Sequence, residues 1–317
     1  MAAGWNHGNE MSKPSTALLI PCHNAENYLK NLRRQVAALE PAFDEMVVVD
    51  DGSTDATVAK ARSLGFDILP LGINRGPGAA RNVAAAHATA EWIHFLDADD
   101  EISPDYLAKV LPLATDGTDV VLCSCDFLDE ATRKRLMQWS FEDAAFSKDP
   151  LPGCLHRGVN TPSSLIRRSK FVEIGGFDEG HRCWEDGDMH LRLALAGAKF
   201  RSIPDVLSFG IRHTRGTSGS DLYCHRCRLD FLHDYEAYVP QIPKADLLSE
   251  VLLNARNLLT EGDRLNAKRA LDLASRLGWT GPESSNPLIA LLAKVPSLGL
   301  RRALFAMQVK ARRGGSW

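Results

Sequence analysis

The sequence has neither a long apolar run nor an apolar leader. A membrane-spanning helix needs roughly 20 consecutive apolar residues, and the best candidate in this chain of 317 residues, LIALLAKVPSLGL, is interrupted by Lys294 and Pro296. The N-terminal stretch MAAGWNHGNEMSKPS is polar and lacks the apolar middle of a secretion signal. We therefore expect a flexible N-terminal arm over residues 1–14 and a cytoplasmic protein without a spanning helix.

An excess of positive charge is also missing. The 37 Lys and Arg residues and the 40 Asp and Glu residues give a net charge of −3, so no overall field attracts a polyanion, and we expect no nucleic acid partner. The charge is uneven, however, because no acidic residue follows Glu283. The basic residues beyond that point are Lys294, Arg301, Arg302, Lys310, Arg312 and Arg313.

The seven cysteines form neither an even set nor a recognised metal-binding pattern. An odd number in a long chain without a secretion signal favours reduced thiols. Two close pairs, Cys123 with Cys125 and Cys224 with Cys227, lack the second pair that a structural zinc site needs. We favour buried or idle thiols over zinc.

Strand and helix patterns alternate through the first hundred residues. The apolar runs TALLIPC, EMVVVD, FDILP and EWIHFLD are separated by the helical patterns AENYLKNLRRQVAALE, DATVAKARSLG and GPGAARNVAAAHATA. This alternation predicts an α/β fold with a mainly parallel sheet flanked by helices. Ligands of such sheets bind beyond the carboxyl ends of the strands, where the polar clusters PCHN, DDGS and DADD would gather.

Helical patterns dominate from about residue 222 to the end. PKADLLSEVLLNARNLLTEGDRLNAKRALDLASRLG predicts two amphipathic helices joined at Gly262. SLGLRRALFAMQVKARRGG places Leu300, Leu304 and Met307 near one face, with Phe305 next to them, and basic residues elsewhere. Such a helix either contacts an anionic membrane surface or docks on the protein with its basic face in solvent. Residues 221–317 are therefore expected to form a C-terminal helical region after a domain at residues 15–220.

Two acid clusters follow predicted strands. Asp97 and Asp99 are two residues apart, so both turn toward one ligand if the backbone stays extended, and their oxygens suit Mg²⁺ or Mn²⁺ shared with a diphosphate. The alternative is a helix start after Ile102 with Ser103 as its cap. At Asp50 and Asp51 the choice is between binding a base or ribose and capping of the next helix by Ser53 or Thr54.

A glycine motif in the third unit, NRGPGAARN, mimics a dinucleotide fingerprint. Arg81 occupies the place of the third glycine, which in that fingerprint lets the helix pack closely on the strand. The first unit, IPCHNAEN, has no glycine. We therefore do not favour NAD.

Seven motifs in order resemble the family 2 glycosyltransferases of the GT-A fold, over about residues 16 to 220. They are IPCHNAENYL, VVVDDGSTDAT, NRGPGAARNVA, FLDADDEISPDYL, IRRSKFVEIGGFDE, WEDGDMHLRLALAG and IRHTRGTS. The resemblance implies transfer of a sugar from a nucleotide-sugar donor with inversion at the anomeric carbon. It also implies a divalent metal, Mn²⁺ or Mg²⁺, on the diphosphate.

The resemblance also implies roles for single residues. Asp99 stands at the direct metal ligand of the DXD motif, Asp97 at the acid on the ribose or on a metal-bound water, and His213 at the late histidine of the metal-diphosphate shell. Asp186 stands at the catalytic base, with Glu185 beside it. The nucleotide contacts would come from Pro21, His23, Glu26, Asp51 and Arg81.

Two further features have open interpretations. TRGTSGS, after His213, is either a lid that orders over the bound donor or a plain linker. Trp184 is either a wall against the acceptor sugar or part of the core.

The sequence thus predicts a metal-dependent inverting glycosyltransferase that uses a nucleotide sugar, UDP-linked above others, and a carbohydrate or lipid-linked hydroxyl acceptor. The setting would be polysaccharide or glycolipid biosynthesis at the inner face of a membrane. The alternative enzyme class is a nucleotidyltransferase, which we would expect to have a Gly-rich, basic loop after the first strand. The segment IPCHNAEN is neither Gly-rich nor basic. A catalytically silent nucleotide-sugar-binding module is disfavoured because Asp97, Asp99, Asp186 and His213 are all present.

Overall fold

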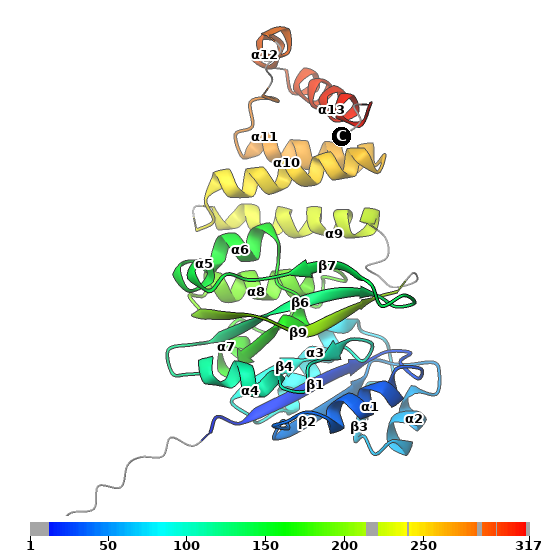
Figure 1. Cartoon of the computed structure of the whole chain (residues 1–317). Coiled ribbons are helices and arrows are strands. Elements are labelled where there is room, and N and C mark those ends of the chain that lie inside the picture. Colours follow the sequence, from blue (N-terminus) through cyan, green and yellow to red (C-terminus); the bar gives the residue numbers. More distant parts are fainter. Residues whose placement is uncertain (1–12, 214–220, 240, 284–286, 296, 315–317) are drawn as a thin grey trace, which may run out of the picture.

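The computed structural model describes residues 13–213, 221–239, 241–283, 287–295 and 297–314. The segment TRGTSGS at 214–220 and nearly all of the N-terminal arm lie outside these residues. The described part extends from a sheet with its helices at one end to a stack of helices at the other (Figure 1).

The first half contains the alternating elements that the sequence predicts. They are β1 (Thr16–Cys22), α1 (Leu29–Ala37), β2 (Glu45–Asp50), α2 (Thr57–Ser63), β3 (Ile68–Pro70), α3 (Pro77–His87) and β4 (Trp92–Phe95). Strands β3, β2, β1 and β4 lie side by side and parallel. Every residue of β1 is buried, because helices cover both faces of a parallel sheet.

The second half of the sheet is mixed. Its elements are β5 (Glu101–Ile102), α4 (Tyr106–Val110), β6 (Val120–Asp129), β7 (Arg135–Trp139), α5 (Asp143–Lys148), α6 (Pro150–His156), β8 (Ser164–Arg167), α7 (Arg168–Glu173), α8 (Glu185–Leu195) and β9 (Phe200–Arg212), with 3₁₀ turns at Leu111–Leu113 and Thr161–Ser163. Strand β8 pairs antiparallel with both β4 and β6, and β9 runs parallel to β6. Within the described residues the sheet order is β3-β2-β1-β4-β8-β6-β9-β5, with β7 on β6.

Two helical layers enclose this sheet. Helix α3 begins with Pro77, which suits the first turn of a helix. Its buried face consists of small residues and Arg81, so the helix lies close to β1 and β2. Helices α1 and α4 cover the other face, where Leu29, Leu32 and Tyr106 are buried.

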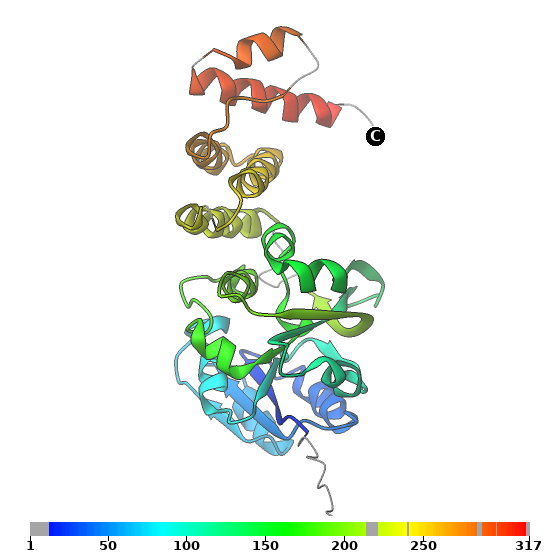
Figure 2. The ribbon, with the colours of Figure 1, turned by 90° about the vertical axis from the view of Figure 1, so that its left-hand side faces the viewer.

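The C-terminal helices pack on this layered domain. They are α9 (Asp221–Asp234), α10 (Lys244–Thr260), α11 (Arg264–Arg276), α12 (Pro287–Ala293) and α13 (Leu298–Gly314), with a 3₁₀ turn at Tyr235–Tyr238. One hydrophobic core continues from the sheet through Phe231 and Leu247 to Ala270. Figure 2 shows α9 to α11 stacked on the sheet domain, with α12 and α13 farthest from it. The predicted hairpin at Gly262 is confirmed, since α10 and α11 pack on each other.

Helix α13 docks on the other helices through only part of its predicted apolar face. Leu304 is buried, and the ring of Phe305 meets Trp279 with 5.7 Å between centroids. Met307 is 62% exposed and does not join them. The helix therefore docks on the protein, as one of the two alternatives predicted. A membrane contact remains a prediction. Within the described residues, no helix is long and apolar enough to cross a bilayer.

The predicted helix caps are wrong. Helix α2 starts after Ala56, while Ser53 and Thr54 bind Asn24 instead. Likewise α4 starts at Tyr106 rather than after Ile102. Glu101 and Ile102 pair antiparallel with β9, and the N–H of Ser103 continues this pairing by bonding the carbonyl oxygen of Leu207.

Gly52 lets two loops meet beside the polar edge of the sheet. Its φ is +67°, and a Cβ at this position would lie 2.4 Å from the carbonyl carbon of Ile73. The loop after β3 can therefore pass close to the loop after β2. Only glycine satisfies both the backbone angle and the close approach.

We expect Gly52→Ala to lower the free energy of unfolding by more than the cost of a positive φ alone. Gly65→Ala is the matched control, because Gly65 has a φ of +80° but nothing within 4 Å of its Cβ position, and its cost should be about 1 to 2 kcal/mol. Urea unfolding followed by circular dichroism measures both. Equal losses in the two variants would show that the close approach is unimportant.

Candidate functional site

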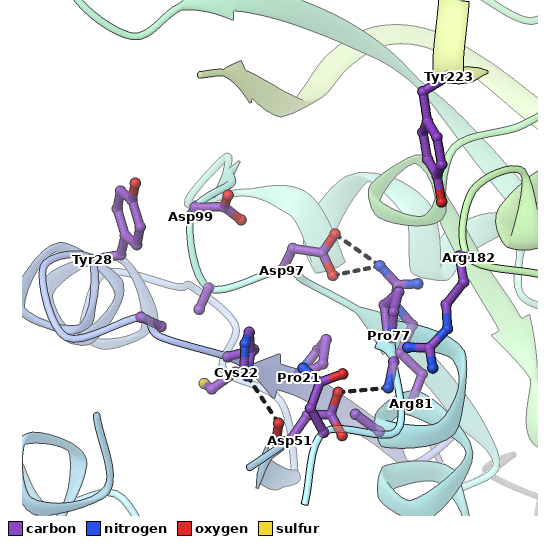
Figure 3. A pocket seen from close by; sticks show the side chains of 16 residues that line it. Pro21, Cys22, Tyr28, Asp51, Pro77, Arg81, Asp97, Asp99, Arg182 and Tyr223 are labelled. Atoms are coloured by element: carbon purple, nitrogen blue, oxygen red, sulfur yellow. Dashed lines mark hydrogen bonds and ion pairs between the residues drawn. The ribbon is translucent and has the colours of Figure 1, made fainter. Parts of the chain in front are cut away.

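A cavity of about 460 Å³ opens at the carboxyl ends of β1, β2 and β4 (Figure 3). Polar side chains reach it from the loops after these three strands and from α3. Six of the predicted residues line it: Pro21, His23, Asp51, Arg81, Asp97 and Asp99. The predicted gathering of the PCHN, DDGS and DADD clusters at one edge is therefore confirmed.

Asp51 organises the floor of the cavity. One carboxylate oxygen accepts the N–H of Arg75 at 2.7 Å, and the other accepts the N–H of Gly76 at 2.8 Å. Its carbonyl oxygen lies 2.9 Å from Nδ1 of His23. Asp51 thus ties the loops after β1 and β3 together. Each of its carboxylate oxygens has a second lone pair for a ligand.

Arg81 is a buried cation between two acid loops. It is 3% exposed. One terminal nitrogen bonds both carboxylate oxygens of Asp97, at 2.7 and 2.8 Å, and the other bonds Glu185 at 2.9 Å. Helix α3 is thereby linked to the loop after β4 and to the start of α8. Asp97 consequently points toward Arg81, as Figure 3 shows.

The neighbouring acids repel one another. Burial and the charge of Asp97 raise the pKa of Asp99, and burial together with Asp97 and Asp99 raises the pKa of Asp100 well above its usual range. Asp100 accepts the N–H of Ile211 at 2.8 Å and so holds the end of β9. A nearby cation would relieve this repulsion.

His213 lies against Asp99. Its Nε2 is 3.1 Å from an oxygen of Asp99 and its Nδ1 is 3.0 Å from an oxygen of Glu130. Both ring nitrogens are buried, and neither contact has hydrogen-bond geometry. The structure therefore brings Asp99 and His213 together, and two buried nitrogens there lack a well-aligned partner.

These residues fit part of a divalent metal shell. No group of three His, Cys, Asp or Glu side chains is arranged to hold an ion in the residues that the structure describes. Asp99 and His213 supply an oxygen and a nitrogen, while Asp97 is held by Arg81. A divalent ion that shares its shell with phosphate oxygens and water needs only one or two side chains.

Asp186 and Glu185 begin helix α8, after Trp184 with its φ of 73°. Asp186 accepts the N–H of Gly187 at 2.7 Å. Burial, and next the charge of Glu185, raise the pKa of Asp186 to about 7, and Arg81 opposes this. A pKa near the working pH suits a general base.

Two predicted residues have other contacts. Glu26 is not among the residues that line the cavity; its carboxylate accepts the N–H of Ala56 at the start of α2. The ring of Trp184 packs on Phe231 and lies under the guanidinium of Arg228, 4.1 Å from the ring centroid. Trp184 therefore belongs to the packing between α8 and α9, and the acceptor-wall interpretation is not supported.

Sequence reasoning missed several residues of the site. Tyr28 lies on one side of the cavity and Arg182 and Tyr223 on the other (Figure 3). Glu130 follows β6 and contacts His213. Tyr28 lies within the motif IPCHNAENYL, but nothing in the sequence singles out the other three.

We expect Arg81→Gln to lower the free energy of unfolding by about 3 to 5 kcal/mol, because it leaves Asp97 and Glu185 without their buried counter-charge. Urea unfolding measures this. Arg75→Gln is the matched control, since the pair of Arg75 with Glu179 is well exposed, and such pairs contribute about 0 to 1 kcal/mol. A similar small loss in both variants would contradict a structural role for Arg81.

Curated proteins are similar to this chain in sequence. The succinoglycan biosynthesis protein ExoU of Rhizobium meliloti is 29% identical over 280 residues, which cover 81% of this chain and 79% of ExoU. The putative glycosyltransferase EpsH of Bacillus subtilis is 34% identical over 119 residues, 36% of this chain and 34% of EpsH.

Two solved structures have a similar fold. Residues 1–349 of S. aureus TarS, in complex with UDP-GlcNAc, match with a TM-score of 0.65 at 20% identity, over 96% of this chain and 93% of that one. The mannosyltransferase PcManGT from Pyrobaculum calidifontis, in complex with GDP-Man and Mn²⁺, matches with a TM-score of 0.60 at 19% identity, over 95% and 87%. The expected GT-A type of fold is thus confirmed.

The family model described as glycosyl transferase family 2 matches residues 17–175, from β1 to the end of α7. This range contains the cavity loops and Arg81. The chain therefore belongs to glycosyl transferase family 2.

Proposed function

We propose that the protein transfers a sugar from a nucleotide-sugar donor, a UDP-sugar above others, to a hydroxyl acceptor, with inversion at the anomeric carbon. The observation that carries the proposal is the network around Arg81, which joins the acid loop of the donor cavity to the acids at the start of α8. The proposed donor site and the proposed base would thus be joined through Arg81.

We propose one orientation of the donor in the cavity. The nucleoside would lie on the floor made by Pro21, His23 and Asp51, whose carboxylate keeps acceptor capacity for a base. The diphosphate would then reach Asp99 and His213. Solved structures of similar fold contain UDP-GlcNAc and GDP-Man.

Asp99 and His213 would hold a divalent metal on the diphosphate, with Asp97 kept beside it by Arg81. PcManGT, which shares the fold, contains Mn²⁺. The metal would neutralise the negative charge that develops on the leaving diphosphate. Mn²⁺ and Mg²⁺ both suit the oxygen-rich shell.

Asp186 would act as the general base. It takes the proton of the acceptor hydroxyl while that oxygen bonds to the anomeric carbon and the carbon–diphosphate bond breaks on the opposite side. Its raised pKa, about 7, makes it a strong enough proton acceptor near neutral pH. Glu185 keeps this pKa high and is itself held by Arg81.

The setting would be polysaccharide biosynthesis in the cytoplasm, with a carbohydrate or lipid-linked acceptor. ExoU, similar over most of this chain, is a succinoglycan biosynthesis protein. A peripheral membrane contact would use the basic C-terminal region, where Met307 and Leu291 are exposed. The proposal includes a glycosyltransferase domain at residues 15–220 and a C-terminal helical region at residues 221–317.

We expect Mn²⁺ to increase the affinity for UDP in the wild type. In Asp99→Asn this increase should be smaller by at least about tenfold, because the amide is a poorer metal ligand than the carboxylate. Calorimetric titration with UDP, with and without Mn²⁺, measures this for both proteins. GDP titrations in parallel establish the nucleotide.

Asp116→Asn is the control for the loss of one negative charge, since Asp116 is exposed and outside the cavity. If Mn²⁺ strengthens UDP binding equally in all three proteins, the metal site is not at Asp99.

We expect Asp186→Asn to leave UDP affinity nearly unchanged and to cut transfer by about 10²-fold or more, the scale of losing a general base. Wild-type transfer should rise as the pH increases through about 7, because the carboxylate form is the base. The residual activity of the variant should lack this rise. Transfer assays with UDP- and GDP-sugars and Mn²⁺ test both.

Glu185→Gln supplies the internal check. Without the neighbouring negative charge the pKa of Asp186 should fall, so the rise in transfer should move to lower pH. Full transfer by Asp186→Asn would show that another group is the base. Donor binding without any transfer by the wild type would favour a silent binding module.

A further inference from the structure

Three of the seven thiols lie near one rim of the cavity, and two of them directly follow residues that line it. Cys183 precedes α8, and Cys224 and Cys227 lie in the first two turns of α9. The thiol of Cys183 donates to the sulfur of Cys224, with 3.7 Å between the two Sγ atoms. The remaining cysteines are buried: Cys22, Cys123, Cys125 and Cys154.

The two thiols of the close pair differ in reactivity. The hydrogen bond from Cys183, together with the positive charge of Arg212, lowers the pKa of Cys224 to about 7 although burial opposes this. The same hydrogen bond and burial raise the pKa of Cys183. Cys224 is thus partly thiolate at neutral pH, and the thiolate is the form that reacts with oxidants.

The pair is placed at the wall of the donor cavity. Arg182 and Tyr223 both line the cavity and are the chain neighbours of Cys183 and Cys224. Figure 3 shows both side chains on the side of the cavity opposite Tyr28. Cys183 also lies three residues before Asp186. A bond between the two sulfurs would therefore fix the wall of the cavity and the entry to α8.

We propose that Cys183 and Cys224 are a hydroperoxide-sensitive pair that forms a reversible disulfide across this rim and thereby slows the enzyme. The thiolate of Cys224 attacks the terminal oxygen of the hydroperoxide and the O–O bond breaks, so that the sulfur becomes a sulfenic acid. The other oxygen leaves as hydroxide or alkoxide and takes up a proton from solvent to give water or an alcohol. The thiol of Cys183 then attacks that sulfur and a water molecule leaves. Two thiols are oxidised and one hydroperoxide is reduced.

Closing the bond moves both segments. The two sulfurs must approach from 3.7 Å to about 2.05 Å. A shift of this size beside the reacting groups is enough to slow a positioned reaction, since a misplacement of about 1 Å can cost about 10²-fold. Because the pair lies next to the site rather than in it, we expect a loss of about tenfold.

The experiment uses the full chain, treated with hydrogen peroxide and then with dithiothreitol. We expect the intact mass to fall by about 2 Da, since two thiol hydrogens are lost. A linked peptide containing Cys183 and Cys224 should appear without reductant. Transfer should fall with the appearance of this peptide and recover with dithiothreitol.

Three variants separate the possible links. Cys227→Ser is the matched control and should behave like the wild type. Cys224→Ser should give no linked peptide and should keep its transfer rate in peroxide. Cys183→Ser should leave a sulfenic acid on Cys224, which dimedone labels.

A link from Cys227 to Cys183 or to Cys224, or a Cys183–Cys224 link with unchanged transfer, overturns the proposal. The effect on transfer rests on the proposed function, but the peptide map does not. If the reduced wild type transfers no sugar, the proposed function fails. In that case, UDP affinity is compared between the oxidised and the reduced protein. A lower affinity after oxidation supports an effect of the link on the cavity, and an unchanged affinity overturns the proposal.

Discussion

The site depends on one buried cation. Arg81 lies between Asp97 and Glu185, which belong to segments far apart in the sequence, and it is nearly closed off from solvent. Burying a guanidinium is costly unless it has well-aligned partners, and here it bonds the carboxylates of Asp97 and Glu185. This contact joins the start of α8 to the loop after β4. The place of the proposed base relative to the donor therefore follows from it.

The crowded acids of this region have separate structural roles. Asp97 is held by Arg81, Asp99 meets His213, and Asp100 anchors the end of β9 at Ile211. In WEDGD, Asp188 is likewise structural, because it bonds Arg192 and the hydroxyl of Tyr235. Capping alone did not account for so many acids in either segment, and their different partners explain the excess.

The sequence predicted those parts of the structure that depend on local patterns. The βαβ alternation and the gathering of Asp51, Asp97 and Asp99 followed from apolar periodicity and from the geometry of parallel strands. Contacts between distant segments carried no such pattern. Glu130 and Tyr223 reach the site only through the packing of β6 and α9. Ser103 does not cap a helix as expected, because β9 pairs with the residues before it and the helix starts later.

Strand β9 pairs with β6 from Phe200 to Arg212, with register shifts on both sides of Ser124 and an unbroken register from Ser208 to Arg212. His213 follows this unbroken stretch directly. Side chains along a strand alternate between two faces, so adding or removing one residue reverses the face of every residue beyond that point. Changes in chain length between Ser208 and Arg212 would therefore turn His213 away from Asp99 unless a second change restored the register. Related chains that keep this histidine in use should vary in length at the exposed turn near Arg133 and keep the length of β9. Selection for the position of this histidine would therefore constrain the length of the strand before it.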